Sequence, residues 1–138
     1  MDERRLFVDA IKLQVGRGYQ YDVLDCSQVI INALRAAGRQ MDDISAQGLY
    51  DLFKGKPVDR LQAPHGSLYF YGKDAGHITH VMTVVEHWDG AGIVLVGARG
   101  GDRACLTLED AAKRRAFVGA VWGDYWLSQF VSAVDPFQ

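Results

Sequence analysis

The hydrophobic positions in the first half of the chain repeat with the period of an α-helix. Residues 4–15 form a first amphipathic segment that ends at Gly16. A second segment runs from Asp25 to Gly38, and a third begins at Ser45. The apolar positions of the second segment recur every three or four residues: Cys26, Val29, Ile30, Ala33, Leu34 and Ala37. The pattern predicts three helices, followed by an irregular connector between Pro57 and Pro64.

In the second half the period changes to that of a β-strand. Residues 67–71 alternate between the two faces of a predicted short strand, and residues 78–88, which are rich in Val, Ile and Thr, predict a longer strand. Asp89-Gly90 is a strong hairpin signal, with a return strand over residues 93–96. Thr107 is a good cap for a short helix over residues 107–113, and residues 116–122 predict the last strand. Helices followed by an antiparallel sheet indicate one α+β domain over residues 1–138.

Composition narrows the classes of function. The chain has 138 residues with a formal net charge of −2, which does not favour nucleic acid or an anionic membrane surface as a partner. No apolar run approaches the roughly 20 residues that a membrane span needs. The N-terminus lacks the apolar core of a signal peptide, so we expect the protein to be made in the cytoplasm. Two cysteines do not make a disulfide scaffold, and a bridge to Cys105 would consume the thiol discussed next.

Cys26 lies at the predicted start of the second helix. Asp25 is a good N-cap, and Gln28 can complete a capping box. Free N–H groups and the positive end of the helix dipole would stabilise a thiolate in the first turn. This is where a nucleophilic cysteine would lie. The same pattern would also arise if Cys26 were only a small apolar residue packed in the core.

A thiolate nucleophile needs a base, which is usually histidine. In a regular strand His80 shares one face with Ile78, Met82 and Val84, inside an apolar run. It is therefore the candidate base, the alternative being a purely structural histidine. His77 and His80 have a helical metal-ligand spacing, but on a strand they diverge, so we expect no metal and no cofactor. For the aromatic residues Trp122, Tyr125 and Trp126, core packing is a simpler interpretation than stacking on sugar.

Three segments resemble the motifs of NlpC/P60 cysteine peptidases, which have a papain-like fold. Asp25-Cys26-Ser27 resembles the Asp-Cys-Ser-Gly motif, and residues 63–70 (APHGSLYF) resemble the Pro-Gly-Asp-Leu strand. Residues 78–81 (ITHV) resemble the Ser/Thr-His-Val strand that carries the base, and the order of cysteine before histidine also matches. The resemblance implies that the cysteine helix packs on an antiparallel sheet.

The resemblance also implies an activity, which is hydrolysis of peptide bonds in the stem peptides of bacterial peptidoglycan. Cys26 would be the nucleophile and His80 the general base, without a cofactor. Asp25 and Ser27 match family positions that line the substrate subsite. The family also has a tyrosine upstream of the cysteine motif, for which Tyr19 is the first choice and Tyr21 the second.

The third catalytic residue of the family has no clear counterpart. With a two-residue turn at Asp89-Gly90, Met82 pairs with Gly97 and His80 with Arg99, so the family position falls at a glycine. Glu86 would share the face of His80 but lie about 20 Å away along the strand. Asp102 could fold back from the Gly100-Gly101 turn, or a backbone carbonyl could orient the imidazole.

Two other functions remain open at this point. The chain could keep the fold as a non-catalytic structural or binding module, such as a phage tail component, or it could be an acyltransferase that uses the same pair of residues. Because neither a signal peptide nor a wall-binding repeat is evident, action on the cell wall would require delivery, for example as part of a phage tail or as an injected effector of phage or prophage origin.

Overall fold

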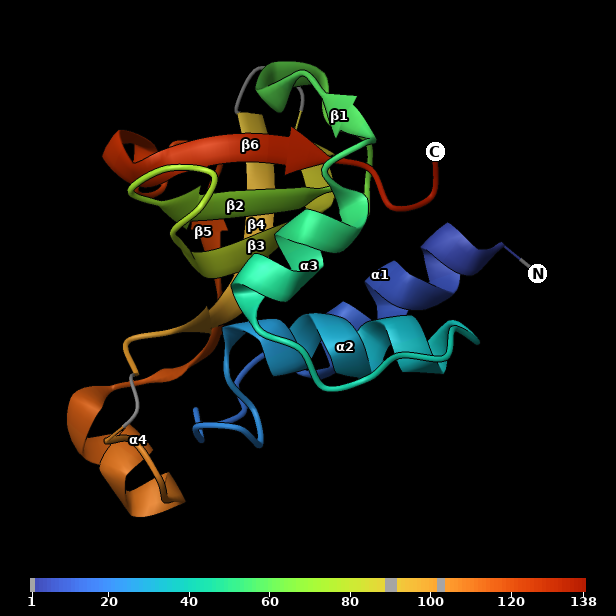
Figure 1. The fold of residues 1–138 in the computed structure, drawn as a ribbon. Coiled ribbons are helices and arrows are strands. Elements are labelled where there is room, and N and C mark those ends of the chain that lie inside the picture. The colour runs from blue at the N-terminus through green and yellow to red at the C-terminus, as the bar shows by residue number, and fades with distance from the viewer. Residues whose placement is uncertain (1, 89–91, 102–103) are drawn as a thin grey trace.

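The computed structural model describes residues 2–88, 92–101 and 104–138. The expected Asp89-Gly90 turn and the candidate Asp102 lie outside these ranges. Within them the elements are α1 (Glu3–Leu13), α2 (Cys26–Ala36), α3 (Ala46–Phe53), β1 (Pro57–Val58), β2 (Leu68–Gly72), β3 (Ile78–Trp88), β4 (Gly92–Arg99), α4 (Leu108–Arg114), β5 (Phe117–Trp122) and β6 (Phe130–Val134), with short 3₁₀ turns at Arg60–Gln62 and Leu127–Gln129. Figure 1 shows the predicted α+β arrangement, with α1, α2 and α3 beside a twisted sheet.

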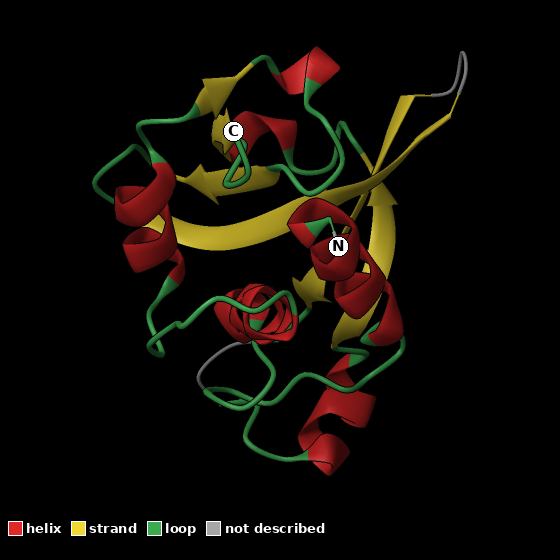
Figure 2. Cartoon of the chain, turned by 90° about the vertical axis from the view of Figure 1, so that its right-hand side faces the viewer, coloured by secondary structure: helices red, strands yellow, loops and turns green. Residues whose placement is uncertain are grey.

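The three predicted N-terminal helices are confirmed. Asp25 caps α2 through its side chain, and Gly38 follows the helix with a φ of +99° that favours glycine. The middle of the predicted apolar face is buried, its two end residues Cys26 and Ala37 are partly buried, and Ile31 is buried as well. The reason is that α2 contacts α1, α3 and the sheet, so more than one face of this helix is covered. In Figure 2, α2 is seen end-on beneath the curved sheet.

The sheet has six strands in the order β1-β6-β2-β3-β4-β5, and every neighbouring pair is antiparallel. Two of its strands were not predicted. β1 lies in the segment expected to be irregular, and β6 follows the strand expected to be last. Because β6 covers one edge of β2 and apolar layers cover both of its faces, β2 is buried throughout and does not alternate.

Two irregularities in β3 change which residues share a face. Tyr71 pairs with His80 and Gly72 with Ile78, so Thr79 is an extra residue in β3. Ile78 therefore packs in the core beside the helices, whereas Met82 packs on the other face, contrary to the predicted parity. A Cβ on Gly72 would lie 2.1 Å from the His77 carbonyl oxygen, so this bulge requires glycine.

A second bulge, at Val85, shifts the pairing of β3 with β4 by one residue from the predicted register. Near the hairpin, Glu86 pairs with Val94 and Trp88 with Gly92, whereas a two-residue turn at Asp89-Gly90 predicts Ile93 and Ala91 as their partners. Glu86 consequently lies on the helix side of the sheet, where its carboxylate is 3.7 Å from the Lys12 amine. It does not face His80, contrary to the prediction.

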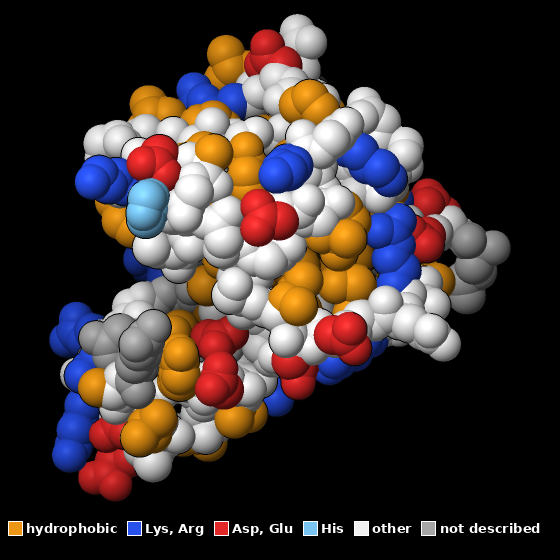
Figure 3. Space-filling view, in the orientation of Figure 1, with side chains coloured by type: hydrophobic (Ala, Val, Ile, Leu, Met, Phe, Trp, Pro, Cys, Tyr) orange, Lys and Arg blue, Asp and Glu red, His pale blue; other side chains and the backbone are white. Residues whose placement is uncertain are grey.

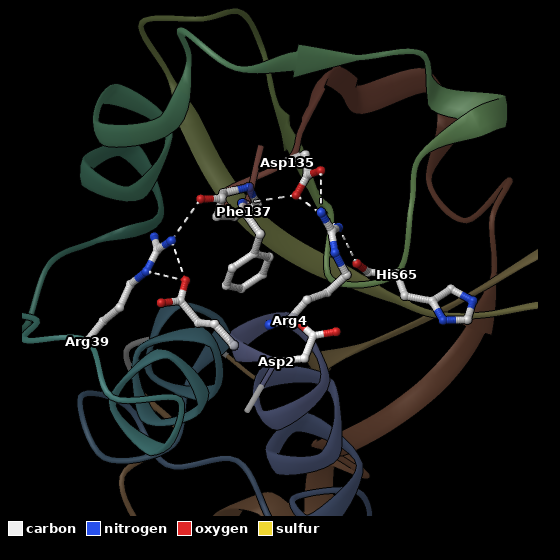
Figure 4. A network of polar contacts seen from close by, with 8 residues as sticks. Asp2, Arg4, Arg39, His65, Asp135 and Phe137 are labelled. Atoms are coloured by element: carbon white, nitrogen blue, oxygen red, sulfur yellow. Dashed lines mark hydrogen bonds and ion pairs between the residues drawn. The ribbon is translucent and has the colours of Figure 1, made fainter.

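The C-terminus is tied to the helices by a polar network around Phe137 (Figure 4). The Arg4 guanidinium donates to both carboxylate oxygens of Asp135, at 3.1 and 2.9 Å, and to the His65 carbonyl at 2.8 Å. Arg4 and Arg39 also lie over the Phe137 ring, 5.5 and 5.0 Å from its centroid. The network fixes α1 and the end of α2 against the segment that follows β6.

A small lobe formed by α4 and residues 15–24 stands beside the start of α2 (Figure 1). Backbone hydrogen bonds join its parts, from Tyr19 N–H to the Ala116 carbonyl and from Tyr21 N–H to the Cys105 carbonyl. Thr107 caps α4 as predicted, because its hydroxyl accepts from Asp110 N–H, and the Asp110 carboxylate in turn accepts from Thr107 N–H. No helix in the described ranges combines the length and apolar character needed to cross a membrane.

Candidate active site

Cys26 lies where two clefts meet. The larger has a volume of about 750 Å³ and the smaller about 310 Å³. Both are lined by Tyr19, Cys26, Thr79 and Gly101. The larger cleft is also lined by Tyr21, Asp22, Asp25, Ser27, Gln28, Asp43, Ile44, Ser45, Ala46 and Ile78. The smaller one is completed by His80, Ala98, Arg99, Gly100, Tyr125 and Trp126. The two predicted catalytic residues therefore border one cleft.

The position of Cys26 is fixed by the loop in front of α2. The Asp25 carboxylate accepts hydrogen bonds from Asp22 N–H at 2.9 Å, Gln28 N–H at 3.0 Å and the Ser27 hydroxyl at 3.0 Å. Asp25 and Ser27 thus line the larger cleft while bound to each other. The predicted capping box is wrong in its second half, because the Gln28 side chain donates to Asn32 and not back to the N-cap.

The Cys26 thiol is only partly exposed in the clefts, and its Sγ lies 3.9 Å from the Thr79 carbonyl oxygen. Burial, followed by the negative charge of Asp25, raises the pKa of the thiol to about 12. Backbone N–H groups of Val81, Ser27 and Cys26 oppose this rise but do not outweigh it. Burial thus opposes the expected stabilisation of a thiolate by the helix N-terminus and favours the thiol form of Cys26 in the free protein. Both cysteines are free, which excludes the disulfide.

His80 is 9% exposed and lines the smaller cleft from β3, and its Nε2 is 3.0 Å from Met82 Sδ. The rings of Tyr71, Tyr125 and Trp126 surround it, with centroids 5.6, 6.2 and 6.0 Å away. Burial lowers the pKa of His80 to about 4, so the imidazole is neutral at pH 7. No hydrogen bond joins Cys26 Sγ to this ring among the described residues.

Of the three aromatic residues near the C-terminus, Tyr125 packs against the core as predicted, whereas Trp122 and Trp126 are exposed. Trp122 is 51% exposed and lines a separate pocket, so core packing is wrong for this residue. Trp126 is 44% exposed and stacks on Tyr71, while Tyr125 meets the same ring edge-on. Tyr125 and Trp126 reach the smaller cleft because the chain passes His80 before it enters β6. Sequence reasoning missed this because β6 itself was not predicted.

The register beside His80 agrees with the sequence prediction, since Thr83 pairs with Val96. Gly97 then lies next to Met82, and a Cβ at Gly97 would be only 2.4 Å from Met82 Sδ. Gly97, where the resemblance implies the third catalytic residue, carries no side chain, and Asp102 lies outside the described residues. Arg99 lines the smaller cleft with its guanidinium over the Phe117 ring, 5.5 Å from the centroid.

Tyr19, the first choice for the upstream tyrosine, borders both clefts, whereas Tyr21 borders only the larger one. The Tyr19 ring lies against the backbone of Gly101, where a Cβ would come within 2.3 Å of it. The described part of the chain has no group of three or more His, Cys, Asp or Glu side chains that could hold a metal ion. The His77 ring instead bonds the Asp74 carboxylate at 2.7 Å.

No protein-family model and no curated protein matches the sequence, but solved structures match the fold. An NLP/P60-family protein from Staphylococcus aureus, described as similar to lipoprotein, has a TM-score of 0.68 and 20% identity; the match covers 98% of this chain and 42% of the staphylococcal one. RipD from Mycobacterium tuberculosis, described as a non-catalytic NlpC/P60 domain protein adapted to peptidoglycan binding, has a TM-score of 0.67 and 15% identity, over 99% of this chain and 98% of RipD. The peptidoglycan hydrolase RipB from the same organism has a TM-score of 0.63 and 14% identity, over 96% of this chain and 63% of RipB. This chain thus spans about two fifths of the staphylococcal protein but nearly all of RipD, and what it shares with all three is the fold of an NlpC/P60 domain.

Proposed function

We propose that the protein hydrolyses peptide bonds in peptidoglycan stem peptides, with Cys26 as nucleophile and His80 as general base. The observation that carries this proposal is that Cys26, at the first residue of α2, and His80, on β3, border the same cleft. Similarity to RipB, described as a peptidoglycan hydrolase, supports the choice of substrate class.

In this reaction the neutral His80 ring takes the thiol proton as Cys26 Sγ attacks the peptide carbonyl carbon. The oxyanion lies near the N–H of Cys26 at the start of α2. The C–N bond then breaks, and the leaving amine receives the proton from His80. Water hydrolyses the thioester with His80 again as base. Because the free thiol is protonated, proton transfer has to accompany substrate binding and attack.

The charges in the two clefts suit a peptide that crosses Cys26. Asp22, Asp25 and Asp43 line the larger cleft, whereas Arg99 lines the smaller one. Figure 3 shows acidic side chains gathered on this face, between the α4 lobe and the sheet. A free amino group of the peptide would therefore occupy the larger cleft, and a carboxylate the smaller one.

The test is digestion of purified insoluble peptidoglycan with the protein and three variants, followed by analysis of the released fragments. We expect fragments from the wild-type protein, none from Cys26→Ala, and a rate at least about 100-fold lower from His80→Gln. His77→Gln is the matched control, because His77 is exposed and outside both clefts, and it should leave the rate unchanged. Equal background release from wild type and Cys26→Ala would reject the hydrolase.

A non-catalytic module that binds stem peptides is the second candidate. It is favoured by the missing side chain at Gly97 and by the lack of a Cys26–His80 hydrogen bond among the described residues, and RipD is described as such a protein. Co-sedimentation with the same peptidoglycan separates the candidates. Equal binding of wild type and Cys26→Ala without any released fragment would support the binding module.

A further inference from the structure

The contact between His80 and Met82 restricts where the imidazole hydrogen lies. Nε2 and Sδ are 3.0 Å apart, and both side chains are buried. A thioether sulfur has lone pairs but no hydrogen, so it can only accept a hydrogen bond. A neutral imidazole carries one N–H. A hydrogen bond across this contact has Nε2–H as its donor, which leaves the lone pair on Nδ1.

Gly97 provides the space that this contact needs. A Cβ at this position would lie 2.4 Å from Met82 Sδ and 3.2 Å from its terminal methyl carbon. The thioether thus fills the volume that a side chain at Gly97 would occupy. Gly97 and Met82 are therefore complementary in volume.

The remaining surroundings of His80 hold the ring by packing. Tyr71, Tyr125 and Trp126 contribute ring contacts. The Tyr71 hydroxyl is buried and has no hydrogen-bond partner in the described ranges. Within those ranges, Met82 Sδ is the one hydrogen-bond partner of the His80 ring.

We propose that Met82 is the positioning residue for His80, taking the place of a polar third residue on β4. It holds the ring with the hydrogen on Nε2, so that Nδ1 can accept the proton of Cys26. The assignment of the hydrogen follows from the contact alone, whereas the proton transfer rests on the proposed hydrolase function.

The hydrogen position is measured directly by ¹⁵N spectra of the imidazole rings at pH 7, with His80 assigned by comparison with His80→Gln. The wild-type spectrum should show a protonated Nε2 and an unprotonated Nδ1. Met82→Leu keeps the volume but removes the acceptor, so both tautomers should appear. Met41→Leu is the matched control and should leave His80 unchanged. A hydrogen on Nδ1 in the wild type, which needs no variant to observe, would overturn the proposal, and so would an unchanged ring in Met82→Leu.

The peptidoglycan digestion then separates this proposal from the proposed function. In Met82→Leu we expect kcat to fall by about tenfold, with KM unchanged, because a weak hydrogen bond orients the base but does not touch the substrate. If the wild type has the Nε2 hydrogen and releases no fragments, the hydrolase fails and the tautomer assignment stands. If the wild type is active and Met82→Leu keeps full kcat, the positioning role fails by itself.

Discussion

The helix side and the sheet side of the candidate site are built in different ways. The helix wall consists of Asp22, Asp25, Cys26 and Ser27, which line the larger cleft. The sheet wall consists of His80, Tyr125 and Trp126, which line the smaller cleft, and of Tyr71 and Met82, which are fully buried and contact His80. The helix wall is polar, and hydrogen bonds between residues close in sequence hold it together. The sheet wall is apolar and brings together side chains from β2, β3 and the segment before β6. Capping therefore positions the nucleophile, whereas packing and the Met82 contact position the base.

Both walls nevertheless favour the uncharged form of their reactive group. Burial raises the pKa of Cys26 and lowers that of His80. On the helix wall, three backbone N–H groups oppose the effect of burial, while on the sheet wall burial acts alone. The resting pair is thus a thiol and a neutral imidazole, and an ion pair would have to be stabilised by the bound substrate.

The largest expected effect comes from acidifying the sheet wall. His80 titrates near 6.5 in the unfolded chain and near 4 in the folded one. Between these values the unfolded state binds a proton that the native state does not, so stability falls as the pH drops from 6.5 towards 4. This difference of about 2.5 units corresponds to a loss on the order of 3 kcal/mol. Urea unfolding at a series of pH values measures it.

The variant His80→Gln is the control for this pH dependence. Between pH 6.5 and 4 its free energy of unfolding should fall less than that of the wild type, by on the order of 3 kcal/mol, because glutamine does not titrate. An NMR titration of the His80 ring gives an independent value. A midpoint close to 6.5 in the native protein would show that the sheet wall does not exclude the charged form.

A smaller effect is expected from removing the cap of the helix wall. Asp25→Ala deletes the acceptor of three hydrogen bonds and should lower the free energy of unfolding by about 2 kcal/mol. Ser45→Ala is the matched control, because Ser45 caps α3 through one bond to Gly48 N–H and should cost about 1 kcal/mol. Thermal or urea unfolding compares the two.

The same Asp25 variant also probes the nucleophile. Loss of the nearby negative charge lowers the pKa of the Cys26 thiol, so alkylation at a fixed pH should be faster in Asp25→Ala than in the wild type. Equal costs of unfolding for Asp25→Ala and Ser45→Ala, or slower alkylation, would contradict this account of the helix wall.

The difference between the walls also explains what could be predicted from the sequence. The start of α2, its Asp25 cap and the Gly38 stop were predictable because they depend on residues a few positions apart. The local spacing also predicted α3 with its Ser45 cap and the short α4.

The sheet wall depended on features that no local pattern carries. A bulge at Thr79 changed the face of Ile78, and the unpredicted β6 brought Tyr125 and Trp126 towards His80. The helix N-terminus alone predicts a lowered pKa for the Cys26 thiol, whereas the burial that the tertiary structure adds raises it. Met82 was read as an apolar strand residue, since its role depends on a glycine in the neighbouring strand.

The smallest expected effect separates two tyrosines that lie two residues apart on β2. Both are fully buried, but the Tyr69 hydroxyl donates to the Arg60 carbonyl, while the Tyr71 hydroxyl has no partner among the described residues. Tyr69→Phe should therefore cost about 1 kcal/mol of unfolding free energy, whereas Tyr71→Phe should be neutral or stabilise by up to about 1 kcal/mol. Urea unfolding of the two variants gives the comparison. If Tyr71→Phe destabilised the protein as much as Tyr69→Phe, the sheet wall would contain a polar interaction of Tyr71, and Met82 would lose its place as the one polar contact beside His80.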